Sequence, residues 1–335
     1  MKQALEKLSQ EGLQKWPEFF KTIEKELYKV EENLNINLPI KANLLKNVIH
    51  YIFTAGGKRI RPALCLLMAN ATGGVIEKHI KLAELTELIH TASLIHDDII
   101  DSANLRRGKE TINNLWNDKI SVIAGDFLFG QASVKLGELE ETEIVKIYAN
   151  VLSDLCEGEI EQFSLKFNTE ISIEAYIRKS IAKTASLFSA ATKSAAILNK
   201  KTKDEIEHAS RFGLYLGIAF QVVDDILDFT GNNFFGKELA KDLKEGIITA
   251  PVIFSINSVD ERSRQLKELI ENRFNNNSED FHRTLKLILE LGGYEKAKQL
   301  ANEYLLKAKE CLSFINNKEA KENLIKAADY VVSRL

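Results

Sequence analysis

The amino-acid sequence predicts an all-α fold, a single large helical bundle over residues 1–335. Three observations support this prediction. Helix-breaking residues are scarce, with 4 prolines and 17 glycines in 335 residues. Apolar residues recur at intervals of three and four through most of the chain, which is the period of a buried or amphipathic helix. Alternating strand patterns flanked by turn dipeptides are hard to find.

The long helices are expected where this apolar period is sustained. In the segment 85–99, for example, Leu85, Leu88, Ala92 and Ile95 recur at spacings of three and four. Several segments are apolar nearly all round, so we expect them in the interior of the bundle. The expected helical segments are 85–99, 122–139, 144–163, 173–198, 206–229 and 281–314.

Short breaks separate these segments. They are expected at 56–57, 73–74, 105–111, 231–251, 275–278 and 292–293. None of them is a long flexible linker between segments of different composition, so one domain is predicted rather than two. Residues 1–32 mix lysine with glutamate at helical spacing, and residues 1–40 are expected to form an N-terminal helical extension.

The composition excludes several classes of protein. The 45 basic and 48 acidic residues give a formal net charge of −3, so we expect no nucleic-acid partner and no binding to a membrane surface. No apolar run reaches the roughly 18 uncharged residues of a membrane span, and no secretory or transit signal is expected. Cys65, Cys156 and Cys311 lie far apart, without zinc spacing, which fits a reducing compartment such as the cytoplasm.

Two carboxylate motifs share one spelling, DDxxD, at 97–101 and 224–228. Each lies within an apolar helical run, where uncompensated negative charge is costly. Within each motif the first and last carboxylates, four residues apart, point the same way, and the middle one sits about 100° round the helix. The carboxylates are those of Asp97, Asp98, Asp101, Asp224, Asp225 and Asp228.

Two facing clusters of carboxylates would repel each other unless cations lay between them. Oxygen ligands without a nearby set of cysteines or histidines favour Mg²⁺, which in such sites also holds substrate phosphates. The sequence therefore predicts that all six aspartates are metal ligands around one cavity.

Basic residues suited to diphosphate binding accompany the motifs. Arg106 and Arg107 follow the first motif, and guanidinium groups bind phosphate through paired hydrogen bonds. The alternative is a helix C-terminus at which the dipole favours basic residues. In the segment GGKRIRP (56–62), Lys58 and Arg61 can face one way at a helix start and form a second anion pocket. The alternative there is an ordinary basic surface loop.

Polar residues on the predicted helices point to the same groove. His90 lies two turns before Asp97 and could donate to a diphosphate oxygen, although a lone helical histidine is more often a core or surface group. Lys183 and Thr184 interrupt an apolar helix, and a buried ammonium needs an anion partner unless it extends to solvent. Gln221 lies three residues before the second motif, where a buried amide requires partners.

The loop after the second motif is a candidate lid. It contains Lys237, Asp242 and Lys244, and such a loop can close over phosphates and exclude water. A solvated connector is the alternative.

Together these motifs resemble the trans-isoprenyl diphosphate synthases, or polyprenyl synthetases, over about residues 45 to 255. The stretch 116–132 and the spelling TAPVIF (249–254) are most similar to the cyanobacterial and plastid long-chain branch. The motifs, in order, are GGKRIRP, LIHDDIID, LRRG, AGDFLF, KTASLF and FQVVDDILDFTG. There are two departures: Ile247 stands where the family often has lysine in EGKxT, and Ala240 where it has glycine in GxxGxD.

The resemblance implies an all-helical bundle around a deep central cavity, usually a homodimer, with about three Mg²⁺ per active site. It implies that Asp97, Asp101 and Asp224 are the principal metal ligands. Isopentenyl diphosphate would be held by Lys58, Arg61, His90 and Arg107. The allylic diphosphate would be held by Arg106, Lys183, Thr184, Gln221 and Lys237. The compartment would be the cytoplasm, or the plastid stroma for an organelle-encoded protein.

The implied reaction is ionisation of the allylic diphosphate, followed by attack of the isopentenyl double bond on the carbocation and loss of a proton. The protein mainly positions the substrates, neutralises charge and excludes water. Lys183, Thr184 and Gln221 are expected to orient charge near the cation.

The length of the product can be argued from the helix that carries the first motif. Ser93 and Ile89 lie one and two turns beneath Asp97, and the rise of a helix puts Ile89 roughly 12 Å below it. Ala92 and Ser93 are small and leave room for a growing chain. We expect a product of C30–C50, solanesyl-like, with Phe129 on the neighbouring helix as a floor. The alternatives are a geranylgeranyl (C20) diphosphate synthase, a non-catalytic subunit of a heteromeric synthase, and a terpene cyclase or head-to-head condensing enzyme.

Overall fold

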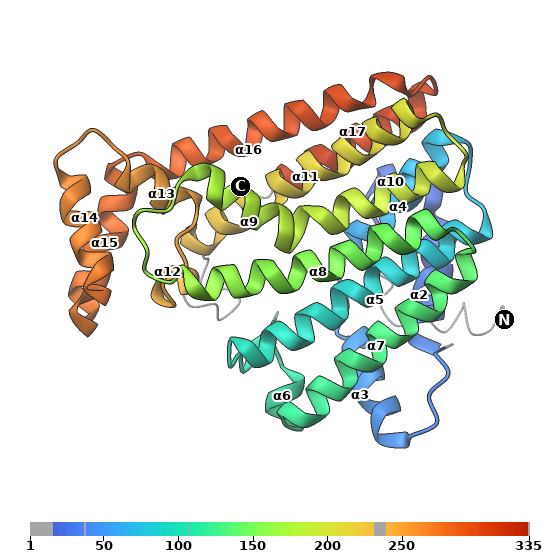
Figure 1. Ribbon diagram of the computed structural model, residues 1–335, viewed down its shortest axis with the longest axis horizontal. Helices are drawn as coiled ribbons and strands as arrows, with labels where there is room; N and C mark the ends of the chain where they lie inside the picture. Colours follow the sequence, from blue (N-terminus) through green and yellow to red (C-terminus); the bar gives the residue numbers. More distant parts are fainter. Residues whose placement is uncertain (1–15, 37, 107, 231–238, 334–335) are drawn as a thin grey trace.

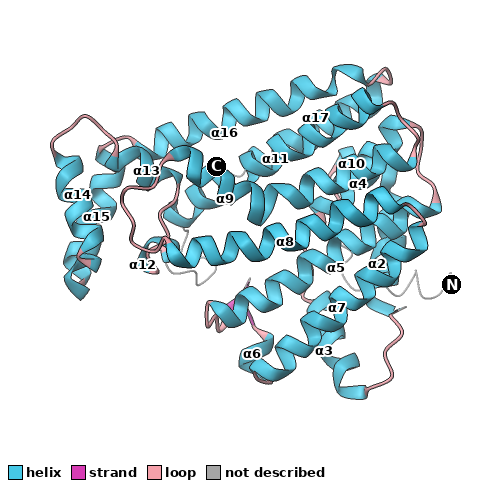
Figure 2. Cartoon of the chain, viewed as in Figure 1, coloured by secondary structure: helices cyan, strands magenta, loops and turns pink. Residues whose placement is uncertain are grey.

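A computed structural model describes residues 16–36, 38–106, 108–230 and 239–333 of the chain. These residues are almost entirely helical (Figure 2), and the strands among them form one short hairpin. The prediction of an all-α fold is therefore confirmed. None of the described helices combines enough length with enough apolar character to span a bilayer.

The N-terminal half leads from a short 3-10 helix to the helix of the first aspartate motif. Its elements are η1 (Glu18–Ile23), α2 (Glu24–Ile36), α3 (Asn43–Thr54), α4 (Ile60–Thr72), α5 (Glu77–Ile100), β1 (Leu105–Arg106), β2 (Lys109–Glu110), α6 (Ile112–Leu115) and α7 (Asp118–Leu139). The two strands pair antiparallel, within a segment that the sequence predicts only as a break.

The C-terminal half contains the helix of the second motif. Its elements are α8 (Thr142–Ser164), α9 (Ile173–Ser180), the π-helical turn η2 (Ile181–Ala185), α10 (Ser186–Leu198), α11 (Lys203–Thr230), α12 (Lys241–Lys244), α13 (Ala250–Ile256), α14 (Arg262–Glu271), η4 (Arg273–Asn276), α15 (Ser278–Glu290), α16 (Gly293–Glu310), η5 (Cys311–Phe314) and α17 (Lys318–Val332). The predicted helix 281–314 is divided at residues 291–292, which overlaps the break predicted at 292–293.

Helix α5 is central to the bundle, because it packs against α7, α4, α10 and α2, while α11 packs against α10 and α16. Leu82, Leu85, Leu88 and Ile89 of α5 are fully buried. Each such side chain contributes about 1.5–3 kcal/mol relative to an exposed one. In Figure 1, α14 and α15 stand at one end of the molecule, beyond α13.

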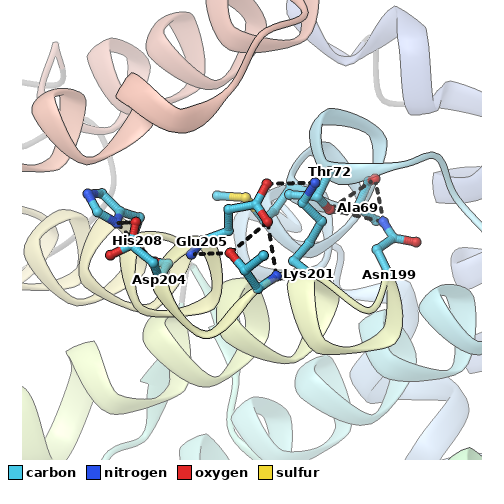
Figure 3. Close-up of polar contacts among 9 residues, drawn as sticks. Ala69, Thr72, Asn199, Lys201, Asp204, Glu205 and His208 are labelled. Atoms are coloured by element: carbon cyan, nitrogen blue, oxygen red, sulfur yellow. Dashed lines mark hydrogen bonds and ion pairs between the residues drawn. The ribbon is translucent and has the colours of Figure 1, made fainter.

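The turn between α10 and α11 is tied to the end of α4 by one amide (Figure 3). Asn199 Nδ2 donates to the carbonyl of Ala69 at 2.8 Å and to Thr72 Oγ1 at 2.9 Å. At the start of α11, Glu205 accepts from the backbone N–H of Thr202 at 2.9 Å and pairs with Lys201 at 2.7 Å. These side chains satisfy backbone groups that a helix end leaves open.

Two glycines let α11 approach its neighbours closely. A Cβ built on Gly213 would lie 2.5 Å from the carbonyl oxygen of Phe188, and one built on Gly217 would lie 2.5 Å from Cα of Ala185. Real Cβ atoms essentially never show such distances. The backbone of α11 therefore lies directly against η2 and α10, which fixes the second motif relative to Lys183 and Thr184.

Candidate active site

Lys183 and Thr184 lie on η2, a π-helical turn inside the helical segment 173–198. A π turn inserts an extra residue into a helix, and such turns are frequent at functional sites. On the side of α8 the turn meets Gly158, where a Cβ would lie 3.0 Å from that of Ala182. The turn is therefore held tightly between α8 and α11.

A chain of hydrogen bonds joins this turn to the second aspartate motif. Thr184 Oγ1 donates to Gln221 Oε1 at 2.5 Å, and Gln221 Nε2 donates to Asp225 Oδ1 at 2.7 Å. The other oxygen of Asp225 accepts from the hydroxyl of Tyr176 at 2.6 Å. Burial, with Asp242 nearby, raises the pKa of Asp225 to about 7, although the two donors oppose the shift. The middle carboxylate of the motif is thus fixed by its neighbours.

The first motif occupies the end of α5 and meets the same turn. Burial raises the pKa of Asp97 to about 6, and the ammonium of Lys183 works against that shift. Lys183 Nζ pairs with Glu159 Oε2 of α8 at 2.6 Å. Although burial alone would lower the pKa of Lys183, Asp97 and Glu159 raise it. The ammonium thus lies between carboxylates of two helices, as the prediction of an anion partner requires.

One cavity of about 160 Å³ brings the two motifs together. Asp101 of the first motif and Asp225 of the second both line it. Lys183 and Gln221 also line it. The central expectation from the sequence, that acidic side chains of two distant helices face a common hollow, agrees with this geometry.

The segment after the second motif is attached to that motif. The two oxygens of Asp228 accept from the backbone N–H groups of Lys241 at 3.2 Å and Asp242 at 3.1 Å. Ala240 adopts a left-handed conformation (φ 49°, ψ 48°). That region favours glycine, which accounts for the glycine of the family pattern at this position. Asp224 lies one turn before Asp228 on α11 and is partly exposed.

Arg61 of the GGKRIRP segment contacts His90. Arg61 Nη1 lies 3.0 Å from His90 Nε2, and the Arg61 guanidinium lies 4.6 Å from the centre of the Phe188 ring. Because a guanidinium can only donate, His90 Nε2 accepts the hydrogen bond from Arg61 in this arrangement. His90 Nε2 can donate to a diphosphate only after its contact with Arg61 is broken. Lys58 Nζ lies 6.0 Å from the centre of the Tyr330 ring.

A second cavity, of about 100 Å³, lies between α3, α5 and the β1–β2 hairpin. His90, Asp98 and Arg106 line it. Arg106 Nε donates to Asp98 Oδ1 at 2.8 Å, so the arginine predicted to bind substrate is paired with a predicted metal ligand. Arg107 and Lys237, also predicted to bind diphosphate, lie outside the described residues.

The donor set fits Mg²⁺ better than a metal that needs a complete protein cage. In the described part of the chain, no group of three histidine, cysteine or acidic side chains forms a metal site by itself. Mg²⁺ typically takes one or two carboxylates from the protein and completes its shell with water and substrate phosphates. Asp97, with its raised pKa, is a half-buried carboxylate that gains from a nearby cation.

Of the residues predicted to limit chain length, three lie on α5 and one, Phe129, lies on α7. Ile89 and Ala92 are fully buried, and Ser93 Oγ donates to the carbonyl of His90 at 2.9 Å. The ring of Phe129 lies 5.7 Å from that of His96, beside the first motif rather than two turns below it. The role of Phe129 as the floor of the chain path stays a prediction.

Several polar residues of the site were not predicted from the sequence. Tyr176 and Lys179 line the cavity of about 160 Å³ that contains Asp101 and Asp225, the acidic cavity. Lys179 is only 7% exposed. Burial lowers the pKa of Lys179, against the attraction of Asp225. Their spacing from Lys183, seven and four residues along one helix, is the signal that could have revealed them. Glu159 gives no such signal because it belongs to another helix.

Comparisons with known proteins point to one family. A family model described as Polyprenyl synthetase matches residues 42–288. The chain is 39% identical over 320 residues to a prenyl transferase of Synechocystis sp., which covers 94% of this chain and 98% of that protein. It is 40% identical over 316 residues to the chloroplastic solanesyl diphosphate synthase 2 of Arabidopsis thaliana, covering 91% and 75%.

A solved structure supports the same assignment. The polyprenyl synthase of Caulobacter crescentus CB15, complexed with calcium and isoprenyl diphosphate, matches with a TM-score of 0.88 at 32% identity, covering 94% of this chain and 97% of that one. The resemblance seen in the motifs is confirmed by these findings, and the chain belongs to the polyprenyl synthetase family.

Proposed function

We propose that this chain elongates an allylic diphosphate by successive head-to-tail 1'-4 condensation with isopentenyl diphosphate, giving an all-trans polyprenyl diphosphate of C30–C50. The observation that carries the proposal is the cavity lined by Asp101, Asp225 and Lys183, whose ammonium interacts with Asp97 of the first motif and with Glu159. The name of the Arabidopsis thaliana relative, a solanesyl diphosphate synthase, supports a long product.

Mg²⁺ is the proposed cofactor, at about three ions per active site. Asp97, Asp101 and Asp224 are proposed as its principal ligands, and Asp98, Asp225 and Asp228 as assisting ones. When bound, Mg²⁺ neutralises charge on the diphosphate oxygens. The Caulobacter crescentus polyprenyl synthase is complexed with calcium and isoprenyl diphosphate, which supports a divalent cation beside the substrate here.

The allylic diphosphate is proposed to lie in the acidic cavity. Lys183 faces that cavity, and Arg106 and Lys237 would complete the cationic contacts. Ile247, which replaces the lysine of the family pattern, also lines the cavity. Lys179 lines it too, and we propose that its ammonium supplies the positive charge that the lysine supplies elsewhere.

Isopentenyl diphosphate is proposed to bind through Lys58, Arg61, His90 and Arg107. The contact between Arg61 and His90 supports a shared anion pocket at the start of α4. His90 lies two turns before Asp97 on α5, which supports a pocket on the helix of the first motif.

The chemistry then follows from charge and position. The allylic C–O bond breaks and its electron pair leaves with the diphosphate. The isopentenyl double bond forms a C–C bond to the resulting carbocation, and a proton passes to the released diphosphate, which restores an alkene. Thr184 Oγ1 donates to Gln221 Oε1, and we propose that these side-chain oxygens lie near the developing positive charge in a site that excludes water.

The growing chain is proposed to descend along α5 past Ser93 and Ala92 toward Ile89. Small side chains at 92 and 93 support this path, because an aromatic ring there would stop elongation early.

The assembly is proposed to be a homodimer. Ile123 and Val134 are exposed apolar residues of α7, and their separation of eleven residues, about three turns, puts them on one face. Such a face gains from burial against a second copy.

We further propose that residues 1–335 form one domain, and that the protein works in the cytoplasm, or in the plastid stroma if encoded there.

The proposed function is tested with purified protein, Mg²⁺, labelled isopentenyl diphosphate and allylic primers of C5 to C20. Reversed-phase chromatography of the products should show C30–C50 chains, and Asp97→Ala should abolish incorporation. Exclusive formation of C15 or C20 would contradict the long-chain proposal. Near-normal turnover by Asp97→Ala would contradict the assignment of the site.

A further inference from the structure

A buried arginine joins the GGKRIRP segment to two different helices. Arg59 is 6% exposed, and its Nη1 donates to Glu87 Oε1 of α5 at 2.7 Å. Its Nε donates to Glu31 of α2, and its Nη2 lies 3.3 Å from the second oxygen of Glu31. One guanidinium therefore bridges α2 and α5 from the end of the loop that precedes α4.

The backbone at this arginine needs such support. Arg59 is the N-cap of α4 and adopts a left-handed conformation with φ 48°. A residue with a Cβ is uncommon there, and the conformation persists only where its surroundings determine it. The two carboxylates fix the guanidinium and thereby hold the direction in which α4 begins.

The direction of α4 matters because the proposed isopentenyl diphosphate ligands lie on either side of Arg59. Lys58 precedes it, and Arg61, two residues later, contacts His90 at 3.0 Å. Glu87 lies about one turn before His90 on α5. The ion pair of Arg59 and Glu87 thus attaches the start of α4, which contains Arg61, to α5, which contains His90.

Charge gives the arginine a second role. Arg59, Glu87 and His90 line the same cavity of about 100 Å³. Without the guanidinium, the carboxylates of Glu31 and Glu87 would direct uncompensated negative charge toward a pocket that must admit a diphosphate.

We propose that Arg59, held by Glu31 and Glu87, is a positioning residue of the isopentenyl diphosphate pocket. Helix α2 lies before residues 42–288, the part of the chain that matches the family model, yet through Glu31 it contributes to the active site. This inference rests on the proposed function.

The test is a kinetic comparison of Glu31→Gln with Glu32→Gln. Glu32 is the next residue of α2, is also partly exposed, and undergoes the same chemical change. The neutral amide keeps the shape of Glu31 but removes its charge, and only the amide oxygen can still accept from Arg59. We expect the KM for isopentenyl diphosphate to rise about fivefold, which is the loss of part of one charge-assisted hydrogen bond. The KM for the allylic primer should stay unchanged.

A second variant, Arg59→Lys, keeps the charge but cannot reach both carboxylates with one ammonium. It should raise the same KM further, by about tenfold or more. Equal rises in both KM values together with a lower urea midpoint would show a purely structural role and overturn the inference. Kinetics of Glu31→Gln identical to those of Glu32→Gln would also overturn it. A wild-type chain that incorporates no isopentenyl diphosphate would overturn the proposed function as well.

Discussion

Gly217→Ala tests whether the close contact between α11 and η2 holds the site together. The added Cβ would lie 2.5 Å from Cα and 2.8 Å from Cβ of Ala185. The atom nearest to it belongs to the backbone of the π turn, so no flexible side chain can move aside to make room. Helix α11 must therefore shift away from the turn.

The magnitude follows from two opposing effects. Alanine in a helix is favoured over glycine by about 1 kcal/mol. Overpacking of a tight core costs about 1–3 kcal/mol, and a clash with backbone lies at the upper end of that range. We expect Gly217→Ala to lower the free energy of unfolding by about 1–2 kcal/mol. Gly137→Ala is the matched control, because a Cβ at Gly137 in α7 meets no atom within 4 Å. It should raise the free energy of unfolding by about 0.5–1 kcal/mol.

Activity should fall for a related reason. Gln221 lies one turn after Gly217, so a shift of α11 lengthens its 2.5 Å hydrogen bond with Thr184. A misplacement of about 1 Å can cost about a hundredfold in rate, so we expect a drop of about ten- to a hundredfold. Urea unfolding and incorporation of labelled isopentenyl diphosphate measure the two effects. Gly217→Ala as stable and as active as Gly137→Ala would refute the reasoning.

Three further predictions concern product length, pH and metal. Ser93→Phe should shorten the main product, as seen by chromatography, and an unchanged product would contradict the proposed path. His79 is fully buried, accepts from the backbone N–H of Ile76 and lies 3.1 Å from the carbonyl of Ala195, and burial lowers its pKa. The unfolded chain therefore binds the proton more readily, and stability is lost as pH falls below about 6.5. His79→Gln should reduce the drop in urea midpoint between about pH 7.5 and about pH 5.5, and an equal drop in both proteins would contradict this assignment. Removal of divalent cations with EDTA should abolish turnover, excess Mg²⁺ should restore it, and turnover that survives chelation would exclude the proposed cofactor.

Much of the fold could be predicted from the sequence because the apolar period is a local signal. The helix with the first motif was expected over 85–99 and forms α5, which begins eight residues earlier at Glu77. That earlier part holds the buried polar residues His79 and Glu84, which obscure an apolar pattern. The hairpin at Leu105–Glu110 was missed because two paired residues on each strand are too few to show alternation.

The residues of the candidate site could be predicted from the sequence where a local pattern of charged or polar residues identifies them. Asp101, Asp225, Lys183 and Gln221 were all selected from the sequence, and all line one cavity. The contact of Arg59 with Glu31 was missed, because contacts between distant helices leave no trace in the spacing along one chain. The π turn at Lys183 was missed for a similar reason, since it depends on packing against α8 and α11.

The most direct test of a shared cavity is a double-mutant cycle between the two motifs. Affinity for a non-hydrolysable allylic diphosphate analogue in the presence of Mg²⁺ would be measured by calorimetry for wild type, Asp101→Asn, Asp225→Asn and the double variant. Residues that act on one cation cluster should show an interaction energy of at least about 0.5 kcal/mol. Losses that simply add would place the two carboxylates in separate sites and contradict the account.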